Sequence, residues 1–531
     1  MRGLRYGSIS LLFVVTGAFA GHGAGPLFQT SDRCLACHNA LSTRSGEDVS
    51  IGFEWSATLM ANSARDPYWQ ASVRRETIDH HESVASIEDE CSVCHMPIVR
   101  YQAKQAGRLG QILAHFPLQA SDKDAADGVT CSVCHQISPE KLGSAASFNG
   151  EFVIDPADAG GVHPEYGPFD IDPGLTQVMR TSTGGFEPRH GEQIRSAELC
   201  ATCHTLFTQA RGAGGEIIGT LPEQMPYQEW LHSDYRNSRT CQSCHMPAVA
   251  GDAPITRILG VDRPGVARHE FVAANFLVQR MLNRYRDELQ VSAEPTELAA
   301  AADRTIGYLQ SQAARVDLSA PQLRAGRLTA EVSVENLGGH KLPTAFPSRR
   351  AWLHVVVRDA KQAVIFESGA LNADGSIQGN DNDLDSARFE PHYTEISSPD
   401  QVQIYEDILS DAQGAVTTGL LSAVGYVKDN RLLPHGFDKA TAAPEIAVHG
   451  TAAADTGFDG SGHRLRYTVD VGSAAGPFEV DAELLYQPIG YRWAKNLRPY
   501  DAPEPQRFSG YFDAMAPASA TLLAKARAVT P

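Results

Sequence analysis

Hydrophobic and polar residues alternate strictly in the C-terminal part of the chain. The alternation is clearest over residues 328–334, 465–471 and 478–484. A period of two buries every second side chain, which is typical of β-strands with one face in a core and the other in solvent. Residues 372–440 interrupt the pattern with Asp, Asn, Gly and Pro. We therefore expect a β-sandwich over residues 320–531 with a long irregular excursion in its middle.

A helical period precedes this region. Apolar residues recur every four positions from Leu277 to Leu289, and a second pattern follows Glu294-Pro295-Thr296. These spacings predict two amphipathic helices, the first of which begins at His269. Further upstream Gly, Pro, Asp and Ser are frequent, so we expect little regular structure there.

The patterns divide the chain into parts. We predict a domain of loops and short helices over residues 21–290, a helical connector over residues 291–319 and an all-β domain over residues 320–531. The fold class is then α+β and multidomain, as suits 531 residues of which 42% are hydrophobic. The net charge of −18 comes without a block of Lys or Arg, which argues against nucleic acid as a partner.

The N-terminus has the parts of a secretory signal. Two arginines precede an apolar stretch, and Ala18-Phe19-Ala20 gives the small-x-small pattern that signal peptidase cleaves. We interpret residues 1–20 as a cleaved signal peptide. The alternative, an uncleaved anchor, has an apolar run too short to cross a bilayer. We expect the mature chain to be exported to the periplasm or the cell surface and to have no membrane span.

All ten cysteines belong to five copies of one pattern, Cys-x-x-Cys-His. The cysteines are Cys34, Cys37, Cys91, Cys94, Cys131, Cys134, Cys200, Cys203, Cys241 and Cys244, and the histidines are His38, His95, His135, His204 and His245. This pattern is typical of haem c attachment, in which both thiols form thioethers and the histidine is the proximal iron ligand. The sequence predicts five covalent haems, whose apolar surface would form much of the N-terminal core.

Other uses of paired cysteines fit the pattern less well. An exported protein with an even number of cysteines suggests disulfides, but no cysteine here lies outside a motif. Structural zinc sites do not require a histidine after every pair, and four-ligand sites would use five motifs unevenly. A redox dithiol of thioredoxin type is expected once in a chain, not five times.

The second axial ligand of each iron decides what the iron can do, because an iron with two protein ligands carries electrons whereas an open iron can bind a substrate. The candidates are His190, His269, His340, His115 and Met60. The first two lie in or after the motif region, and His340 lies in a Gly-rich turn that could dock the β-domain on a haem. Each histidine could instead be a surface residue, and Met60 a core residue.

The acidic run from Asn380 to Asp385 could offer oxygen ligands to Ca²⁺. It lacks the glycine and the terminal glutamate of a helix-loop-helix calcium site. A solvated loop is the alternative that we favour.

Several stretches resemble a group of bacterial multihaem c-type cytochromes, related in their haem half to the hydroxylamine-oxidoreductase and pentahaem nitrite-reductase lineage. In the haem half these are residues 197–205, 222–230, 241–247 and 269–271, and in the β-domain residues 339–344, 347–352 and 428–434. The resemblance implies electron carriage with mostly bis-histidine haems. It departs at Met60 and Tyr235, which stand where related cytochromes have a distal histidine. Catalytic members often alter the proximal ligand of their active haem, whereas all five motifs here end in His.

Two functions follow as hypotheses. The first is an electron-transfer protein whose redox partners are other cytochromes or a membrane quinol-linked complex. The second is an oxidoreductase with one open haem that acts on a small nitrogen or sulfur compound, with Arg65, Tyr68 and His81 as conceivable pocket residues. A β-domain that serves chiefly as a surface-binding module is a further alternative. We favour the first and assign no catalytic residue.

Overall fold

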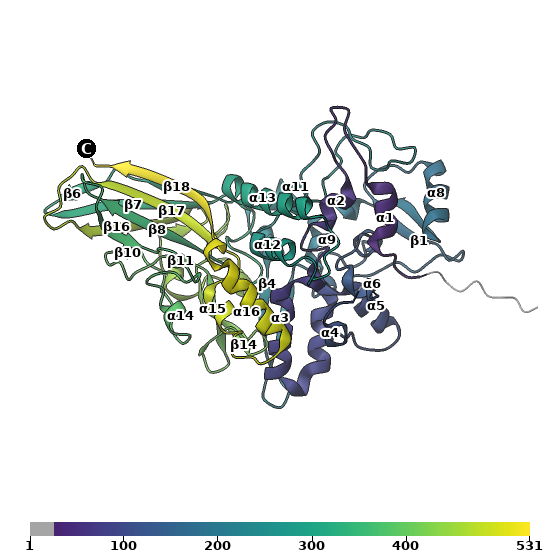
Figure 1. Ribbon diagram of the computed structural model, residues 1–531, viewed down its shortest axis with the longest axis horizontal. Helices are drawn as coiled ribbons and strands as arrows, with labels where there is room; N and C mark the ends of the chain where they lie inside the picture. Colours follow the sequence, from purple (N-terminus) through teal and green to yellow (C-terminus); the bar gives the residue numbers. More distant parts are fainter. Residues whose placement is uncertain (1–25, 120, 531) are drawn as a thin grey trace, which may run out of the picture.

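The computed structural model describes residues 26–119 and 121–530. The expected signal peptide, residues 1–20, lies outside these residues. Short helices and loops make up one end of the molecule and long strands the other (Figure 1). The predicted α+β, multidomain fold class is confirmed. In the described part of the chain, no helix has both the length and the apolar character needed to cross a membrane.

Each Cys-x-x-Cys-His motif lies on or beside a short helix. The five helices are α1 (Ser31–His38), α4 (Val84–His95), α7 (Cys131–Gln136), α9 (Ala197–Ala201) and α11 (Cys241–His245). A helical turn brings residues three and four apart to the same side, so both thiols and the histidine of a motif can face one planar group.

We call residues 26–275, which contain the five motifs, the motif half. Its other helices and strands surround the five motif helices. They are α2 (Ile51–Ser56), α3 (Pro67–Asp79), α5 (Pro97–Gln105), α6 (Lys123–Ala126), α8 (Pro173–Thr183), α10 (Pro226–Leu231), the parallel pair β1 (His163–Gly167) and β2 (Phe186–His190), and the hairpin β3 (Leu206–Arg211) and β4 (Ile217–Gln224). A proline opens α3, α5, α8 and α10, because the first turn of a helix does not need that residue's missing N–H. Asp66 caps α3 by accepting from the backbone N–H groups of Tyr68 and Trp69.

Two helices follow the motifs, α12 (Phe276–Arg284) and the longer α13 (Pro295–Gln312). Glu294 and Glu297 form a reciprocal capping box at the start of α13. The prediction that the first helix begins at His269 is wrong, since residues 269–275 are irregular and α12 starts at Phe276.

Three sheets follow the helices. The first contains β5 (Ala314–Leu318), β6 (Gln322–Arg324), β7 (Arg327–Asn336), β10 (Glu395–Ile396), β15 (Phe458–Asp459) and β16 (Gly462–Asp470). The second contains β8 (Arg350–Arg358), β9 (Val364–Ser368), β11 (Ile404–Tyr405), β17 (Glu479–Gln487) and β18 (Thr521–Val529). The third and smallest contains β12 (Asp407–Asp411), β13 (Val416–Thr417) and β14 (Ala423–Asp429). Buried positions alternate with exposed or half-buried ones along β7, β16 and β17, as the sequence pattern predicts.

We call residues 314–530 the two-sheet half, after its two main sheets. It also contains helices that the periodicity did not predict. They are α14 (Asp381–Leu384), α15 (Tyr491–Lys495) and α16 (Pro503–Met515). Helix α16 packs against α3 of the motif half, so the last part of the chain lies beside one of the first helices (Figure 1).

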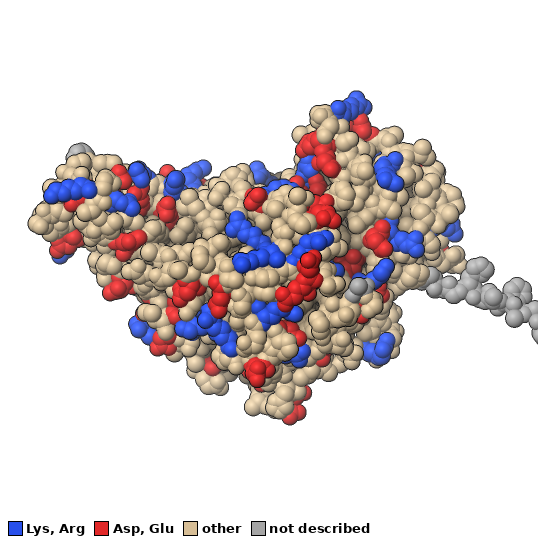
Figure 2. Space-filling view, in the orientation of Figure 1, with Lys and Arg blue, Asp and Glu red and all other residues tan. Residues whose placement is uncertain are grey.

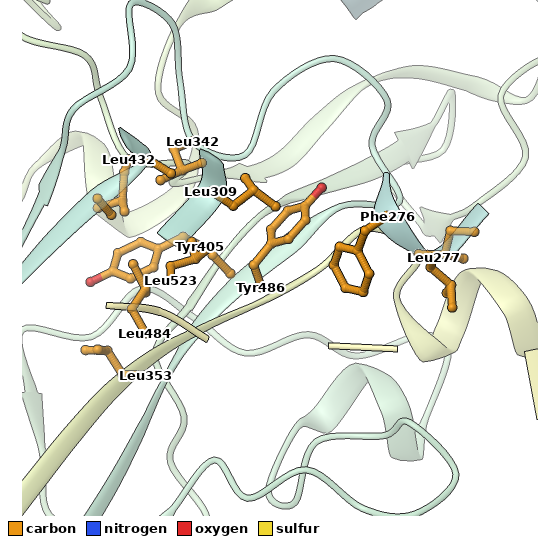
Figure 3. Close-up of a cluster of buried hydrophobic side chains, with 14 of the residues drawn as sticks. Phe276, Leu277, Leu309, Leu342, Leu353, Tyr405, Leu432, Leu484, Tyr486 and Leu523 are labelled. Atoms are coloured by element: carbon orange, nitrogen blue, oxygen red, sulfur yellow. The ribbon is translucent and has the colours of Figure 1, made fainter. Parts of the chain in front are cut away.

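One large apolar cluster joins the two halves. It contains residues of both main sheets, such as Val332 and Leu484, together with Phe276 and Leu277 of α12 and Leu309 of α13 (Figure 3). Apolar area removed from water is the main stabilising term in folding. The two halves therefore share a core and are not joined by a bare linker.

A buried ion pair fixes the excursion after β9 to the second sheet. Both terminal nitrogens of Arg350 donate to the Asp383 carboxylate, at 2.8 and 2.9 Å, and Asp383 also accepts from the backbone N–H of Ile377. Asp381, in the same acidic run, pairs with Arg388. At Asp381 and Asp383, two of the carboxylates considered as calcium ligands, the neighbouring positive charge is that of an arginine.

We predict that Asp383→Asn lowers the free energy of unfolding by roughly 3–5 kcal/mol, because it leaves a buried guanidinium without its counter-charge. Denaturant unfolding followed by circular dichroism measures the change. Asp513→Asn is the matched control: Asp513 pairs with Arg498 at the surface, where a pair is worth about 1 kcal/mol or less. Equal midpoints for Asp383→Asn and wild type would contradict the prediction.

Candidate haem-binding site

Four of the five motif histidines have the same ring orientation. The Nδ1 atom of His38 lies 2.6 Å from the carbonyl oxygen of Ile255, that of His95 lies 2.9 Å from Ser63, and that of His135 lies 2.6 Å from Tyr166. His245 makes the same contact with Val272. A carbonyl only accepts, so Nδ1 carries the proton and donates. The Nε2 lone pair is left free, which is how metal-binding histidines are oriented.

The fifth motif histidine, His204, has a different environment. Its side chain is exposed, whereas those of the other four motif histidines are half-buried. Desolvation lowers the pKa of His204, and the nearby Arg349 guanidinium lowers it further. Burial likewise lowers the pKa of His95 to about 4. Neutral imidazoles are the form in which histidine binds a metal ion.

Two motif histidines face a second histidine. The ring centroids of His135 and His269 are 6.4 Å apart with planes inclined by 17°, and those of His245 and His340 are 6.2 Å apart with planes inclined by 14°. Two imidazoles that share one metal ion through Nε2 have centroids roughly 6 Å apart, because each metal–nitrogen bond is about 2 Å long. Both pairs therefore have the separation of two axial ligands.

The distal members of these pairs also have their Nδ1 atoms occupied. Nδ1 of His269 lies 3.2 Å from the Ala267 carbonyl oxygen, and Nδ1 of His340 lies 2.9 Å from that of Lys341. Burial, with the neighbouring His135, lowers the pKa of His269 to about 3. In both residues Nε2 is again the nitrogen that is free to bind a metal.

The thiols of different motifs lie close to one another. Cys131 raises the pKa of Cys34, Cys94 raises that of Cys203, and Cys241 raises that of Cys200. Cys134 adds to the rise at Cys200 and Cys203. These contacts place the first motif beside the third, the third beside the fourth, and the fourth beside both the second and the fifth.

The thiols, the ring orientations and the histidine pairs together fit covalent haem c. Each motif presents two half-buried cysteines, and four of the five present a histidine whose Nε2 is free. An apolar planar group bound there would be enclosed by protein and held by thioethers to both thiols.

Three other predicted ligands lie elsewhere. The His190 side chain is 42% exposed, and its Nε2 is 2.9 Å from Glu192 Oε1. His115 lies on a short turn with Nδ1 4.0 Å from Asp122 Oδ2. Met60 is half-buried, and its carbonyl oxygen accepts from the Val129 N–H. None of these contacts places the three side chains opposite a motif histidine.

Sequence reasoning missed Trp69. Its ring stacks on His95 with a centroid separation of 4.2 Å and an interplanar angle of 1°. The stacking holds the imidazole plane from one side, while the Ser63 carbonyl holds Nδ1. A tryptophan in a helix after the first motif carries no signal for this contact, since the contact depends on how α3 packs against α4.

A second polar cluster lies in the two-sheet half. His392 Nε2 is 2.9 Å and His463 Nε2 is 3.4 Å from Asp455 Oδ2, and both rings are buried. Two histidines and a carboxylate are a common metal-binding set.

The hydrogen bonds around His392 give the cluster a different role. The side-chain amides of Gln403 and Asn430 both donate to His392 Nδ1, at 3.2 and 3.1 Å. The oxygens of these amides accept from backbone N–H groups, so their orientation is fixed. Nδ1 of His392 is therefore an acceptor, and Nε2 carries the proton that it donates to Asp455. That proton lies where a metal ion would have to bind.

No model of a protein family matches the chain, and a search of curated proteins found no match. Among solved structures, the chain is similar to a penta-haem cytochrome c552 from Thermochromatium tepidum. The TM-score is 0.53 and the sequence identity 15%, and the match covers 95% of this chain and 100% of that one. The chain thus has the fold of a multihaem cytochrome c over nearly its whole length, including the two-sheet half.

We predict that the intact protein denatured in acid keeps the mass of five haems, because thioether bonds survive unfolding. Mass spectrometry of the denatured holoprotein measures it. Replacing Cys241 and Cys244 with Ser should remove one haem and leave four. A denatured wild-type mass equal to that of the bare polypeptide would contradict covalent attachment.

The His392 cluster gives a pH prediction. Burial lowers the pKa of His392 to about 3, below the ordinary value of 6.5. Between pH 3 and pH 6.5 the unfolded chain binds a proton at this histidine that the folded chain does not. The contribution of neutral, buried His392 to the free energy of unfolding is therefore fully present above pH 6.5 and decreases as the pH falls toward 3. His392→Gln, which keeps a donor toward Asp455, should reduce this slope by up to about 1.4 kcal/mol per pH unit. Denaturant unfolding at pH 7, 6 and 5 tests it; parallel profiles for the two proteins would show that His392 does not titrate.

Proposed function

We propose that the protein is an exported pentahaem c-type cytochrome that carries electrons to or from a redox partner. When bound, each haem supplies one iron that accepts and releases a single electron. The pairing of His135 with His269 and of His245 with His340 carries the proposal, because an iron with two protein ligands transfers electrons without binding a substrate.

The chain's own residues would set the properties of each iron. Backbone carbonyls hold the proximal rings through Nδ1, which fixes the tautomer and raises the basicity of Nε2. Burial of the motifs excludes water and shifts the reduction potential. The motif contacts support a path from the first motif through the third to the fourth, with the second and the fifth next to the fourth.

Export and the partner are also part of the proposal. The signal-like residues 1–20 and the five attachment motifs support a location in the periplasm or at the cell surface. The net charge of −18 would steer a basic redox partner, such as another cytochrome, by a salt-sensitive attraction. On the face in Figure 2, acidic and basic residues are interspersed, so no concentrated basic patch for nucleic acid is visible there.

The resemblance in sequence supports a haem half related to the hydroxylamine-oxidoreductase and pentahaem nitrite-reductase lineage. The two facing main sheets support a β-sandwich as the second domain. In this proposal the second domain does more than shield the first, since it supplies His340.

One observation favours a second candidate function. The His204 side chain is exposed, and the Arg349 guanidinium is near enough to lower the pKa of His204. An open iron with a positive charge beside it would suit a small anionic nitrogen or sulfur compound. His81, considered for such a pocket, is 75% exposed and pairs with Glu82, so it does not contribute.

Electron paramagnetic resonance of the air-oxidised protein, with and without cyanide or nitrite, separates the two functions. We predict low-spin signals from the irons of the third and fifth motifs, unchanged by either anion. His269→Ala and His340→Ala should each convert one of these low-spin irons to a high-spin form that binds the anion.

His190→Ala is the matched control, because that histidine is exposed and pairs with Glu192; its spectrum should equal that of wild type. If the spectra of His269→Ala and His340→Ala both equal that of wild type, the proposed ligation is contradicted. A high-spin, nitrite-responsive iron in the wild type would instead support the second function.

A further inference from the structure

A buried carboxylate of the motif half reaches into the loop that carries His340. Glu229, on α10, is fully buried. Its Oε2 accepts from the backbone N–H of Lys341 at 3.0 Å and from the hydroxyl of Thr344 at 2.6 Å. Its Oε1 lies 3.3 Å from a terminal nitrogen of Arg431. One glutamate thus binds two segments of the two-sheet half.

The backbone of Lys341 connects Glu229 to the His340 ring. The N–H of Lys341 donates to Glu229, and the carbonyl oxygen of Lys341 accepts from Nδ1 of His340. The Asn336 side chain also holds the His340 carbonyl oxygen, at 2.7 Å. The peptide unit between His340 and Lys341 is therefore bound at its carbonyl oxygen by Asn336 and at its N–H by Glu229, which fixes the loop that directs His340 toward His245.

Charged groups around Glu229 keep it in place. Arg431 makes two further contacts to Asp429, at 3.0 and 2.7 Å, and Lys341 Nζ donates to the same carboxylate at 2.7 Å. All of these side chains are buried. Buried charges are tolerated only when they are paired and hydrogen-bonded, so removing one member is costly.

The adjoining loop approaches the motif half closely. A side chain at Gly339 would bring its Cβ to 3.4 Å from Trp230 and from Tyr235. The hydroxyl of Tyr235 donates to the carbonyl oxygen of Leu337 at 2.9 Å. The contact surface is thus formed by α10, the turn after it and the His340 loop.

We infer that Glu229 is the positioning residue that sets His340 as an axial ligand, so that the contact between the two halves tunes the fifth haem. This inference rests on the proposed function, because it takes His340 as a ligand. Glu229 acts only through Lys341 and the loop, and it does not touch the ring.

The test compares variants of the full holoprotein by electron paramagnetic resonance and by redox titration. In Glu229→Ala, the signal of one iron in five should become a mixture of low-spin and high-spin forms, and the midpoint potential of that haem alone should shift. Glu229→Gln keeps an oxygen that can accept from Lys341 and Thr344, so it should restore the wild-type spectrum although it loses the charge that faces Arg431.

Glu504→Ala is the matched control. Glu504 is a buried glutamate that also joins the two halves, through Arg74 at 2.8 and 3.1 Å, and within residues 26–119 and 121–530 it makes no hydrogen bond or ion pair with the His340 loop. It should leave all haem signals unchanged. If Glu229→Ala does not accumulate, Glu229→Asp, which withdraws the carboxylate by one methylene, should still shift one potential.

The outcomes separate the inference from the function on which it rests. If His340→Ala changes one iron while Glu229→Ala and Glu229→Asp match wild type, the positioning role is wrong and the ligation stands. If His340→Ala changes no iron, the proposed ligation itself is wrong. If Glu229→Ala and Glu504→Ala change the haem signals and the midpoint potential equally, Glu229 only stabilises the contact between the halves, and the inference is wrong.

Discussion

The motif half depends on the motif histidines as fixed points, because it has little continuous core of its own. Its apolar residues form several small clusters, whereas the large cluster lies in the two-sheet half and the helices packed on it. Each oriented histidine joins two separate segments: His38 contacts Ile255, which is 217 residues away, and His245 contacts Val272. A planar apolar group bound at each motif would add the buried surface that the loops cannot supply. The short helices, the many turns and the paired thiols all follow from that one requirement.

The second half is attached to the first by more than apolar packing. Helix α16 lies along α3, Arg74 pairs with Glu504, and Glu229 binds the His340 loop. Interfaces between domains that move are usually smaller and more polar than a shared core. Here the core is continuous from α12 to both main sheets, so the two halves are held as one unit. A ligand contributed across such an interface, as His340 is in our proposal, can be held as rigidly as one from the same domain.

Local patterns in the sequence predicted the parts of this structure that depend on local physics. Alternation identified β7, β16 and β17, and the five attachment motifs could be found without any structure. The start of α12 was misplaced at His269, although the apolar period begins only at Leu277, next to the observed start at Phe276. The backbone N–H of His269 is instead bound by the Glu54 carboxylate, a contact between distant segments that the period does not reveal. A distal ligand depends on which distant segment faces a motif. His340, in a Gly-rich turn, and His269 face motif histidines, whereas His190, with no less promising a sequence context, pairs with Glu192 at the surface.

The arrangement of the motifs gives the molecule two different ends. The fifth motif faces His340, so the two-sheet half covers that side. The first motif lies on α1, on the side of the molecule away from the long strands (Figure 1). The loop that holds His38 through Ile255 exposes Leu259 and Val261. In the proposed function the two-sheet half therefore acts on the fifth motif, to which it supplies His340, and the exposed Leu259 and Val261 lie in the loop that holds the histidine of the first motif.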